Sequence, residues 1–459
     1  MTIVSERARE SRPLSSIMEG NCFARRDLGQ LPASDQALIA RREGALANCY
    51  RLFYRHPLRV AAGSGCHITD HQGNRYLDAY NNVASVGHAN PAVAAAVARQ
   101  LALINSHTRY LHEGIVDYAE QLLATFPAEL DKVIFTNSGS ESNDLAVRIA
   151  KLATGGDGVV VTAEAYHGTT DLLARLSPAL GGGFVRDPAV RLVEPPDPYR
   201  QPAADLSAAF GERVAAAFAD LLDCGIRPAA LLVDSIMSSD GIFPQPIGTV
   251  AAAAGAARAA GALVICDEVQ PGFGRMGQGW WGFARHGLVP DLVTLGKPMG
   301  NGIPVAAVVG RAEAVDAFGR QVAYFNTFGG NPVAIAAAQA VLDFIADNDL
   351  IAHAGSVGRR LRAGLDRLAG RHGMIGDVRG AGLYYGLEIV ADKTTRQPDS
   401  ATALAIVNGL RDRLVLISVC GPNNNVLKIR PPLVFGNADA DELFSAFDAV
   451  LNAQPRPPA

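Results

Sequence analysis

Features that mark several classes of protein are scarce in this sequence, and cysteine is the first of them. The six cysteines are scattered along the 459 residues, at Cys22, Cys49, Cys66, Cys224, Cys266 and Cys420. They form no C-x-x-C pair and no His/Cys cluster with the spacing of a zinc site. We therefore expect neither a disulfide framework nor a structural metal, and scattered thiols favour a reduced, cytoplasmic protein.

Charge of one sign and long hydrophobic runs are also scarce. The formal net charge is −4 with 19% charged residues, which gives no electrostatic basis for binding nucleic acid or an anionic membrane. The longest apolar stretch, residues 249–266, is interrupted by Gly255, Arg258 and Gly261, so it is not a membrane span. The N-terminus shows neither the apolar core nor the cleavage site of a secretion signal.

The order of the predicted elements indicates an α/β protein. Helices are expected at residues 91–105 and 142–151, and they alternate with short apolar strands. These strands are expected at 132–136, 158–162, 229–234, 262–267, 292–295 and 305–309. Alternation of this kind is typical of a mostly parallel sheet covered by helices.

The chain is long enough for one large and one smaller domain. Residues 34–50 predict a helix and 68–77 a hairpin, while after about residue 340 a long helix precedes further strands and a final helix. We expect three parts: an N-terminal arm, or part of the small domain, at residues 1–60, a large domain at 61–335, and a small α+β domain at 336–459.

Lys297 is the first candidate functional residue. It lies in the segment LGKPMGNG (residues 295–302), directly after a predicted strand. Glycine and proline leave little side-chain bulk around its amine. Burial beside one polar partner would lower the pKa of this lysine and make it a nucleophile able to form a Schiff base. An ordinary surface lysine is the alternative.

Asp267 lies upstream of Lys297, at the C-terminal end of an apolar strand, where open α/β sheets place their ligand sites. An ordinary acid at a strand end is the alternative. Pyridoxal phosphate needs a lysine for its aldehyde and an acid that keeps its pyridine nitrogen protonated. Together, Lys297 and Asp267 favour this cofactor.

Ser138, Gly139 and Ser140 indicate a phosphate-binding loop, because they stand between a predicted strand and a predicted helix. Free backbone N–H groups at a helix start, together with hydroxyls and a glycine, bind phosphate well. A plain helix cap is the alternative, since Ser and Asn are favoured there in any case. The presence of Lys297 and Asp267 makes phosphate binding the favoured interpretation.

Other residues suit contacts with a flat, phosphorylated cofactor. Tyr166, which precedes His167 and Gly168, could stack on its ring, although a tyrosine of the core is the alternative. Val269 could press on the opposite face of the ring. Thr327 offers a hydroxyl beside bare glycine backbone, which suits phosphate but is also compatible with a simple loop.

The segment GFGRMG (residues 272–277) matches the G-x-G-x-x-G pattern of dinucleotide-binding proteins. In those proteins the glycines open a helix. Here they run into GWWG (residues 279–282), and Asp291 begins a new strand after Pro290. The structural context of a nicotinamide site is therefore missing.

With these motifs in their order, the chain resembles the class III, fold type I pyridoxal-phosphate aminotransferases. The resemblance covers nearly the whole chain from about residue 50, and its motifs are NSGSE (137–141), YHG (166–168), DEVQPGFGR (267–275), GKPMG (296–300) and TFGGNP (327–332). It implies that residues 61–335 form a cofactor-binding domain around a mostly parallel sheet of the seven-stranded type.

The resemblance also implies roles for individual residues. Lys297 would form the Schiff base, Asp267 would contact the ring nitrogen, and Gln270 would lie near the ring hydroxyl. Tyr166 and Val269 would enclose the ring between them.

The remaining roles implied by the resemblance concern the phosphate. Gly139 and Ser140 would hold it, with Ser138 and His167 in the same cofactor site. In this family, Thr327 would reach the phosphate of the neighbouring subunit. A homodimer with shared active sites is therefore implied.

Within the family, three stretches look most similar to the branch of ethanolamine-phosphate and phosphohydroxylysine phospho-lyases. They are NNVASVGH (81–88), TRYLH (108–112) and NVLKIRPP (425–432). We predict that four residues of these stretches bind the substrate, namely Asn82, Arg109, Lys428 and Arg430.

Lys428 carries the most chemical information of these four. Many transaminases of the family have an arginine at this position, which holds the α-carboxylate of the substrate through two parallel hydrogen bonds. Lysine lacks that planar fork. In addition, Asp234 and Ser235 replace the Glu-Pro pair of the family. Both departures count against an ordinary amino-acid transaminase.

Two reaction types compete. A phospho-lyase would eliminate phosphate and ammonia from a small phosphorylated amine such as phosphoethanolamine, and this is the favoured reading. A transaminase would move an amino group from an amine or ω-amino acid to a keto acid, with Arg430 as the carboxylate clamp. A non-enzymatic cofactor-binding protein is disfavoured, because it would be expected to lack Lys297 or to carry a DNA-binding module.

Overall fold

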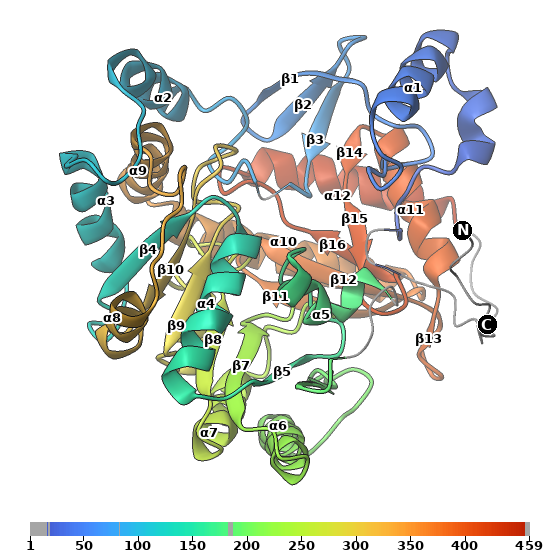
Figure 1. Cartoon of the computed structure of the whole chain (residues 1–459). Coiled ribbons are helices and arrows are strands. Elements are labelled where there is room, and N and C mark those ends of the chain that lie inside the picture. The colour runs from blue at the N-terminus through green and yellow to red at the C-terminus, as the bar shows by residue number, and fades with distance from the viewer. Residues whose placement is uncertain (1–15, 17–18, 82, 182–186, 455–459) are drawn as a thin grey trace, which may run out of the picture.

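A seven-stranded sheet forms the centre of the molecule (Figure 1). The computed structural model describes residue 16 and residues 19–81, 83–181 and 187–454. In spatial order the strands are β4 (Lys132–Thr136), β10 (Ala306–Gly310), β9 (Leu292–Leu295), β8 (Leu263–Asp267), β7 (Pro228–Asp234), β5 (Gly158–Thr162) and β6 (Val190–Val193). Strand β10 is antiparallel to both neighbours, and the other pairs are parallel. The predicted α/β class with a mostly parallel sheet is confirmed.

Helices cover this sheet and surround the smaller sheets. Those of the first half are α1 (Ala33–Ala45), α2 (Pro91–Leu103), α3 (Glu113–Leu123), α4 (Gly139–Thr154), α5 (Asp171–Arg175) and α6 (Leu206–Asp223). Those of the second half are α7 (Thr249–Ala259), α8 (Ala312–Gln321), α9 (Pro332–Asp347), α10 (Leu350–Arg371), α11 (Ser400–Asp412) and α12 (Asn437–Asn452). Short 3₁₀ turns are η1 (Arg25–Gln30), η2 (Pro178–Leu180) and η3 (Gly282–His286).

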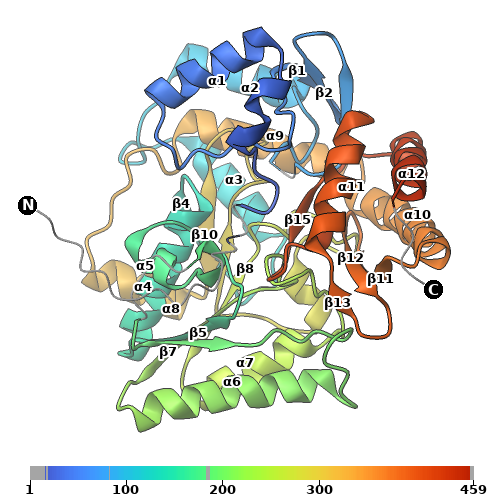
Figure 2. The ribbon, with the colours of Figure 1, turned by 90° about the vertical axis from the view of Figure 1, so that its right-hand side faces the viewer.

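The central strands are apolar on both faces because both faces are covered. In β7, Leu231 and Val233 belong to the same apolar cluster as residues of α6 and α7. The alternate residues Ala230 and Leu232 cluster with α4 and α8. Side chains of a strand point to opposite faces in turn, so this run of buried residues implies a layer of helices on each side. Figure 2 shows α6 and α7 side by side below β5 and β7.

Two smaller sheets complete the fold. One contains β1 (Val60–Ser64), β2 (His67–Asp70), β3 (Arg75–Asp78) and β14 (Val415–Leu416). The other contains β11 (Ile375–Ala381), β12 (Tyr384–Asp392), β16 (Val426–Ile429), β15 (Ser418–Cys420) and β13 (Gln397–Pro398). The predicted hairpin is confirmed, since β2 and β3 pair antiparallel. Because β3 also pairs with β14, strands near residue 75 share a sheet with the C-terminal part of the chain (Figure 1).

Several boundaries differ from the predicted ones. Helix α1 ends at Ala45, whereas the sequence predicted residue 50. Helix α4 begins at Gly139 rather than at 142, because the Ser138 side chain caps it by accepting a hydrogen bond from the Glu141 N–H. The single long helix predicted after 340 is two helices, since Asp349, between α9 and α10, has a φ of 46°.

Among the helices of the described residues, none has both the length and the apolar character needed to cross a membrane.

Candidate active site

A cavity of about 330 Å³ opens at the C-terminal edge of the central sheet. Nine predicted site residues line it: Ser138, Gly139, Ser140, Tyr166, His167, Asp267, Val269, Gln270 and Lys297. The volume lies at the lower end of the range for small-molecule sites. Segments that are far apart in the sequence meet here because parallel strands end at one edge of their sheet.

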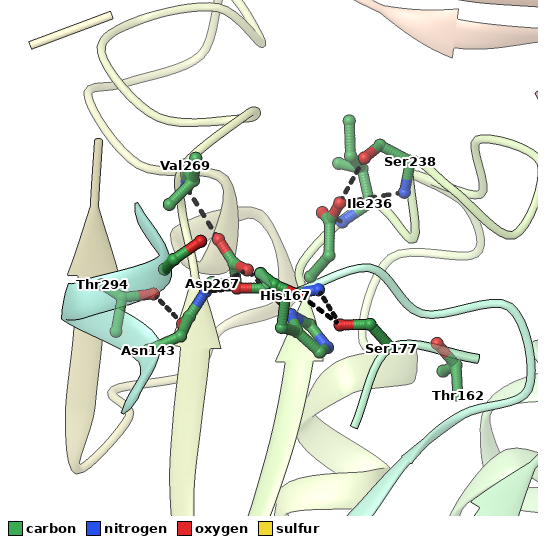
Figure 3. Close-up of polar contacts among 12 residues, drawn as sticks. Asn143, Thr162, His167, Ser177, Ile236, Ser238, Asp267, Val269 and Thr294 are labelled. Carbon is green, nitrogen blue, oxygen red and sulfur yellow. Dashed lines mark hydrogen bonds and ion pairs between the residues drawn. The ribbon is translucent and has the colours of Figure 1, made fainter. Parts of the chain in front are cut away.

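Asp267 is held rigidly at the floor of the cavity (Figure 3). Its Oδ2 accepts a hydrogen bond from Asn143 Nδ2 at 2.8 Å and lies 2.8 Å from His167 Nδ1, while its Oδ1 accepts from the Val269 N–H at 3.0 Å. Asn143 is held in turn by Thr294, whose hydroxyl donates to its Oδ1 at 2.6 Å. These contacts fix the carboxylate at the end of β8.

The first turn of α4 forms a concave wall of backbone. Gly139 and Ser140 begin this helix, so no helical carbonyl can accept their N–H groups, and the helix dipole adds positive charge. A Cβ on Gly139 would lie 2.9 Å from Val269 Cγ2, so only glycine fits between the helix and the strand end. This wall suits an anion.

Lys297 follows β9 and lines the cavity. Burial lowers its pKa to about 8, with a further contribution from the positive charge of Arg430, while Asp267 acts in the opposite direction. The uncharged form that a nucleophile requires is therefore far more accessible near neutral pH than it is for a lysine with the ordinary pKa of 10.5.

Lys428, on β16, and Arg430, just beyond it, are buried, and neither is among the residues that line the cavity. Lys428 Nζ donates to the Ser238 carbonyl at 3.1 Å, and burial together with the charge of Arg430 lowers its pKa. Arg430 Nε donates to the Tyr80 carbonyl at 2.8 Å, and its guanidinium also contacts Gln270 Oε1. Within the described chain, neither cation is ion-paired with a carboxylate.

Of the predicted site residues that the structure describes, four are not among those that line the cavity: Lys428, Arg430, Thr327 and Arg109. Thr327 and Arg109 are exposed, and the Arg109 guanidinium lies 4.0 Å above the ring of Phe325. Asn82 lies outside the described residues.

Asn143 and Asp234 are among the lining residues that sequence reasoning did not assign to the site. Asn143 lies three residues after Ser140 on α4, so helical spacing from the phosphate motif could have identified it. Asp234 ends β7 and is paired in register with Asp267, which ends β8. Burial and the charge of Asp267 raise the pKa of Asp234.

The sequence profile of the family described as aminotransferase class-III matches residues 53–451. This match covers most of the 459 residues. The chain belongs to the class-III aminotransferases. It is therefore an enzyme of that family, as the motifs predicted.

Two relatives in animals are similar over nearly their whole length. "Alanine--glyoxylate aminotransferase 2-like" of Drosophila melanogaster is 40% identical over 448 residues, covering 94% of this chain and 90% of the relative. "Ethanolamine-phosphate phospho-lyase homolog 1" of Caenorhabditis elegans is 38% identical over 445 residues, covering 92% and 95%. The class-III aminotransferase thus has relatives named for both reaction types.

Solved structures give the same picture. A phospholyase from Arthrobacter in complex with phosphoethanolamine has a TM-score of 0.89 and 45% sequence identity, covering 91% of this chain and 100% of that one. An amine transaminase from an uncultivated Pseudomonas species, in its PLP-bound form, has a TM-score of 0.79 and 29% identity, covering 86% and 94%. The fold type I architecture of this class-III aminotransferase is confirmed.

The cofactor of this family is pyridoxal 5′-phosphate, and the cavity of this class-III aminotransferase fits it. A lysine whose pKa is lowered by burial, a fixed carboxylate and a glycine-walled helix start all face one space. His167 Nε2 is buried and has no partner within the described chain, so this polar atom is available to a ligand or water. The predicted cofactor is therefore confirmed.

Proposed function

We propose that this enzyme is a phospho-lyase that removes phosphate and ammonia from a small phosphorylated amine such as phosphoethanolamine. One observation carries this proposal: Lys428 and Arg430 are two buried cations without a carboxylate partner. Both lie close enough to Lys297 for their charges to lower its pKa. The likeness to the Arthrobacter phospholyase and the worm phospho-lyase homologue supports the proposal.

Buried cations are costly unless they meet an anion, because desolvation is not repaid by carbonyl groups alone. A substrate phosphate carries up to two negative charges and has several acceptor oxygens, so it can neutralise two separate cations. It needs no single planar fork. A carboxylate carries one charge and is held best by a bidentate arginine, which the Lys428 position does not provide.

We assign the chemistry to residues that line the cavity. Lys297 would hold the cofactor through Nζ and would take the proton from the carbon beside the substrate nitrogen. Asp267 would keep the cofactor's pyridine nitrogen protonated. Tyr166 and Val269 would enclose the ring, and the N–H groups of Gly139 and Ser140 would hold its phosphate. When bound, the cofactor supplies the electron sink for this proton transfer.

The overall reaction balances without an amino acceptor. The carbon–oxygen bond to the substrate phosphate breaks as the proton leaves the neighbouring carbon, and the phosphate departs with the electron pair. Water then hydrolyses the released enamine. For phosphoethanolamine, one water is consumed, and acetaldehyde, ammonia and phosphate are formed.

Transamination is the second candidate. Arg430 supports it, because a guanidinium near the cavity could hold a substrate carboxylate, with Lys297 returning the proton to the cofactor. However, the Arg430 side chain already donates to the Tyr80 carbonyl and contacts Gln270, so a carboxylate would have to displace existing partners.

We also propose a cytoplasmic homodimer in which each active site takes Thr327 from the partner. Thr327 is exposed and lies outside its own cavity, which suits a residue that serves a second subunit. The neighbouring Phe325 and Phe328 are exposed as well, and such side chains are typical of a contact surface. Cys49, Cys66, Cys224, Cys266 and Cys420 are free thiols, in keeping with a reducing compartment.

The test of the proposed reaction is the release of phosphate and ammonia from phosphoethanolamine without any keto acid. We expect both products in equal amounts over many turnovers, and none from a Lys297→Ala variant. If phosphate is not released without a keto acid, while pyruvate or another keto acid permits amino transfer, the enzyme is the transaminase.

A further inference from the structure

The loop that carries Thr327 is shaped by one side chain, Asn326. Asn326 Oδ1 accepts hydrogen bonds from the backbone N–H of Phe328 at 3.2 Å and of Gly329 at 2.9 Å. The side chain therefore closes a turn around Thr327. Without these two bonds, the threonine would have no fixed direction, since it is exposed.

The same side chain fastens this turn to the start of α4. Asn326 Nδ2 donates to Glu141 Oε2 at 3.2 Å, and Asn326 Oδ1 accepts from Asn137 Nδ2 at 2.9 Å. Glu141 Oε2 also accepts from the backbone N–H and the amide of Asn137, at 2.7 and 3.0 Å. Asn137 and Glu141 flank Ser138, Gly139 and Ser140, which line the enzyme's own cavity.

Backbone contact holds the loop against the same strand end. A Cβ on Gly329 would lie 2.5 Å from the Phe135 carbonyl oxygen of β4. The loop therefore rests on β4 and α4, while the Thr327 side chain stays exposed. The position and the direction of the loop are therefore set by residues of the same subunit.

We infer that Asn326 is a positioning residue for the cofactor site of the partner subunit. This inference rests on the proposed sharing of Thr327 between subunits. Asn326, anchored on Asn137 and Glu141, presents the Thr327 hydroxyl to the cofactor phosphate bound in the other subunit. Asn137 and Glu141, which flank the phosphate-binding residues of one subunit, thereby also help to form the phosphate site of the other subunit.

The inference predicts an effect that acts across the subunit interface. In a heterodimer, one chain carries Lys297→Ala and the other Thr327→Ala, and two different affinity tags allow its purification. Lys297 then remains only in the site that receives an intact Thr327 from the partner. Borohydride fixes the cofactor on lysine, so the label on Lys297 reports this composite site alone. The measured quantity is the pyridoxal phosphate concentration that gives half-maximal labelling of the apoenzyme.

Asn326→Ala is then introduced into one chain or the other. On the Lys297→Ala chain, which supplies Thr327, we expect this concentration to rise about tenfold, the size of one lost hydrogen bond to a charged group. On the Thr327→Ala chain the effect should be several times smaller, because the loop there has lost its threonine. As a matched control, Asn348→Ala on the Lys297→Ala chain removes a side-chain hydrogen bond at the far end of α9 and should change nothing.

A double substitution tests the hydrogen bond between the two anchoring side chains. Asn326→Asp on the Lys297→Ala chain places a carboxylate beside that of Glu141 and should weaken the labelling of Lys297 in the other chain. Adding Glu141→Gln restores a donor and an acceptor in exchanged positions and should recover most of the loss.

An equal or larger effect of Asn326→Ala on the Thr327→Ala chain, or no effect on either chain, would overturn the inference while leaving the shared site intact. If the parent heterodimer is labelled no better than the Thr327→Ala homodimer, the shared site itself is wrong and the inference falls with it.

Discussion

His167 Nδ1 lies 2.8 Å from Asp267 Oδ2, and both side chains are almost completely buried. Since an ionised carboxylate can only accept, this nitrogen carries a proton and donates it. Asn143 donates to the same oxygen. Two donors on one side leave Asp267 to face the cavity in a single orientation, at the place where a pyridine nitrogen needs a negative partner.

Asp267→Asn should lower the rate by roughly a hundredfold or more while the cofactor stays bound, because a neutral amide cannot hold the proton on the pyridine nitrogen. Rate and retained cofactor are measured on the same preparation. Asp234→Asn is the matched control, since that residue ends the adjacent strand of the same cavity, and it should lose much less activity. Near-normal activity of Asp267→Asn would refute the assigned role.

His167→Phe should lower kcat about tenfold, because it removes one hydrogen bond to a charged group. His167→Gln keeps a donor and should recover part of this rate. If His167→Gln is no more active than His167→Phe, His167 has a packing role only.

The rate at which apoenzyme takes up cofactor on Lys297 should rise with pH, with a midpoint near pH 8, and level off above it. Burial lowers the pKa of this amine from 10.5 to about 8, and only the uncharged amine reacts with an aldehyde. Arg430→Gln removes a positive charge that disfavours the ammonium form, so the midpoint should move to higher pH. A midpoint near 10.5 in the unmodified enzyme, or label on any other lysine, would contradict this account.

Lys428→Ala should weaken binding of a phosphorylated amine by about 1.5–3 kcal/mol, or roughly ten- to a hundredfold in KM, if the lysine makes one charge-assisted contact. Lys428→Met keeps most of the side-chain length without the charge and should show a similar loss. If methionine restores normal KM, the residue contributes packing rather than charge.

The central sheet was predictable because its strands are short, apolar runs that end in turn residues. Strand β6 (Val190–Val193) was missed, since this edge strand carries Arg191 and is only partly buried. The division between α9 and α10 was missed because it depends on the backbone of Asp349, where a non-glycine residue takes a positive φ. The local sequence predicts where apolar runs lie, but it does not predict where a non-glycine residue takes a positive φ and divides a helix.

Site residues within motifs were predictable, and those contributed by long-range packing were not. Lys297, Asp267 and the Ser138–Ser140 loop stand beside strand and helix ends, where backbone geometry implies their chemistry. In contrast, the Thr294 hydroxyl reaches Asn143, and Tyr384 donates to Gln270 Oε1 at 2.9 Å. Such contacts join segments that only the folded chain brings together. The substrate roles of Arg109 and Asn82 stay predictions.

The form of the cofactor during reaction tests the proposed lyase most directly. Excess phosphoethanolamine is added to the holoenzyme without any keto acid, and the absorbance of the cofactor is followed together with free phosphate. We predict many turnovers of phosphate per active site while the cofactor remains in its pyridoxal form. Stoichiometric conversion to the pyridoxamine form, with no phosphate released, would contradict the lyase and leave the transaminase.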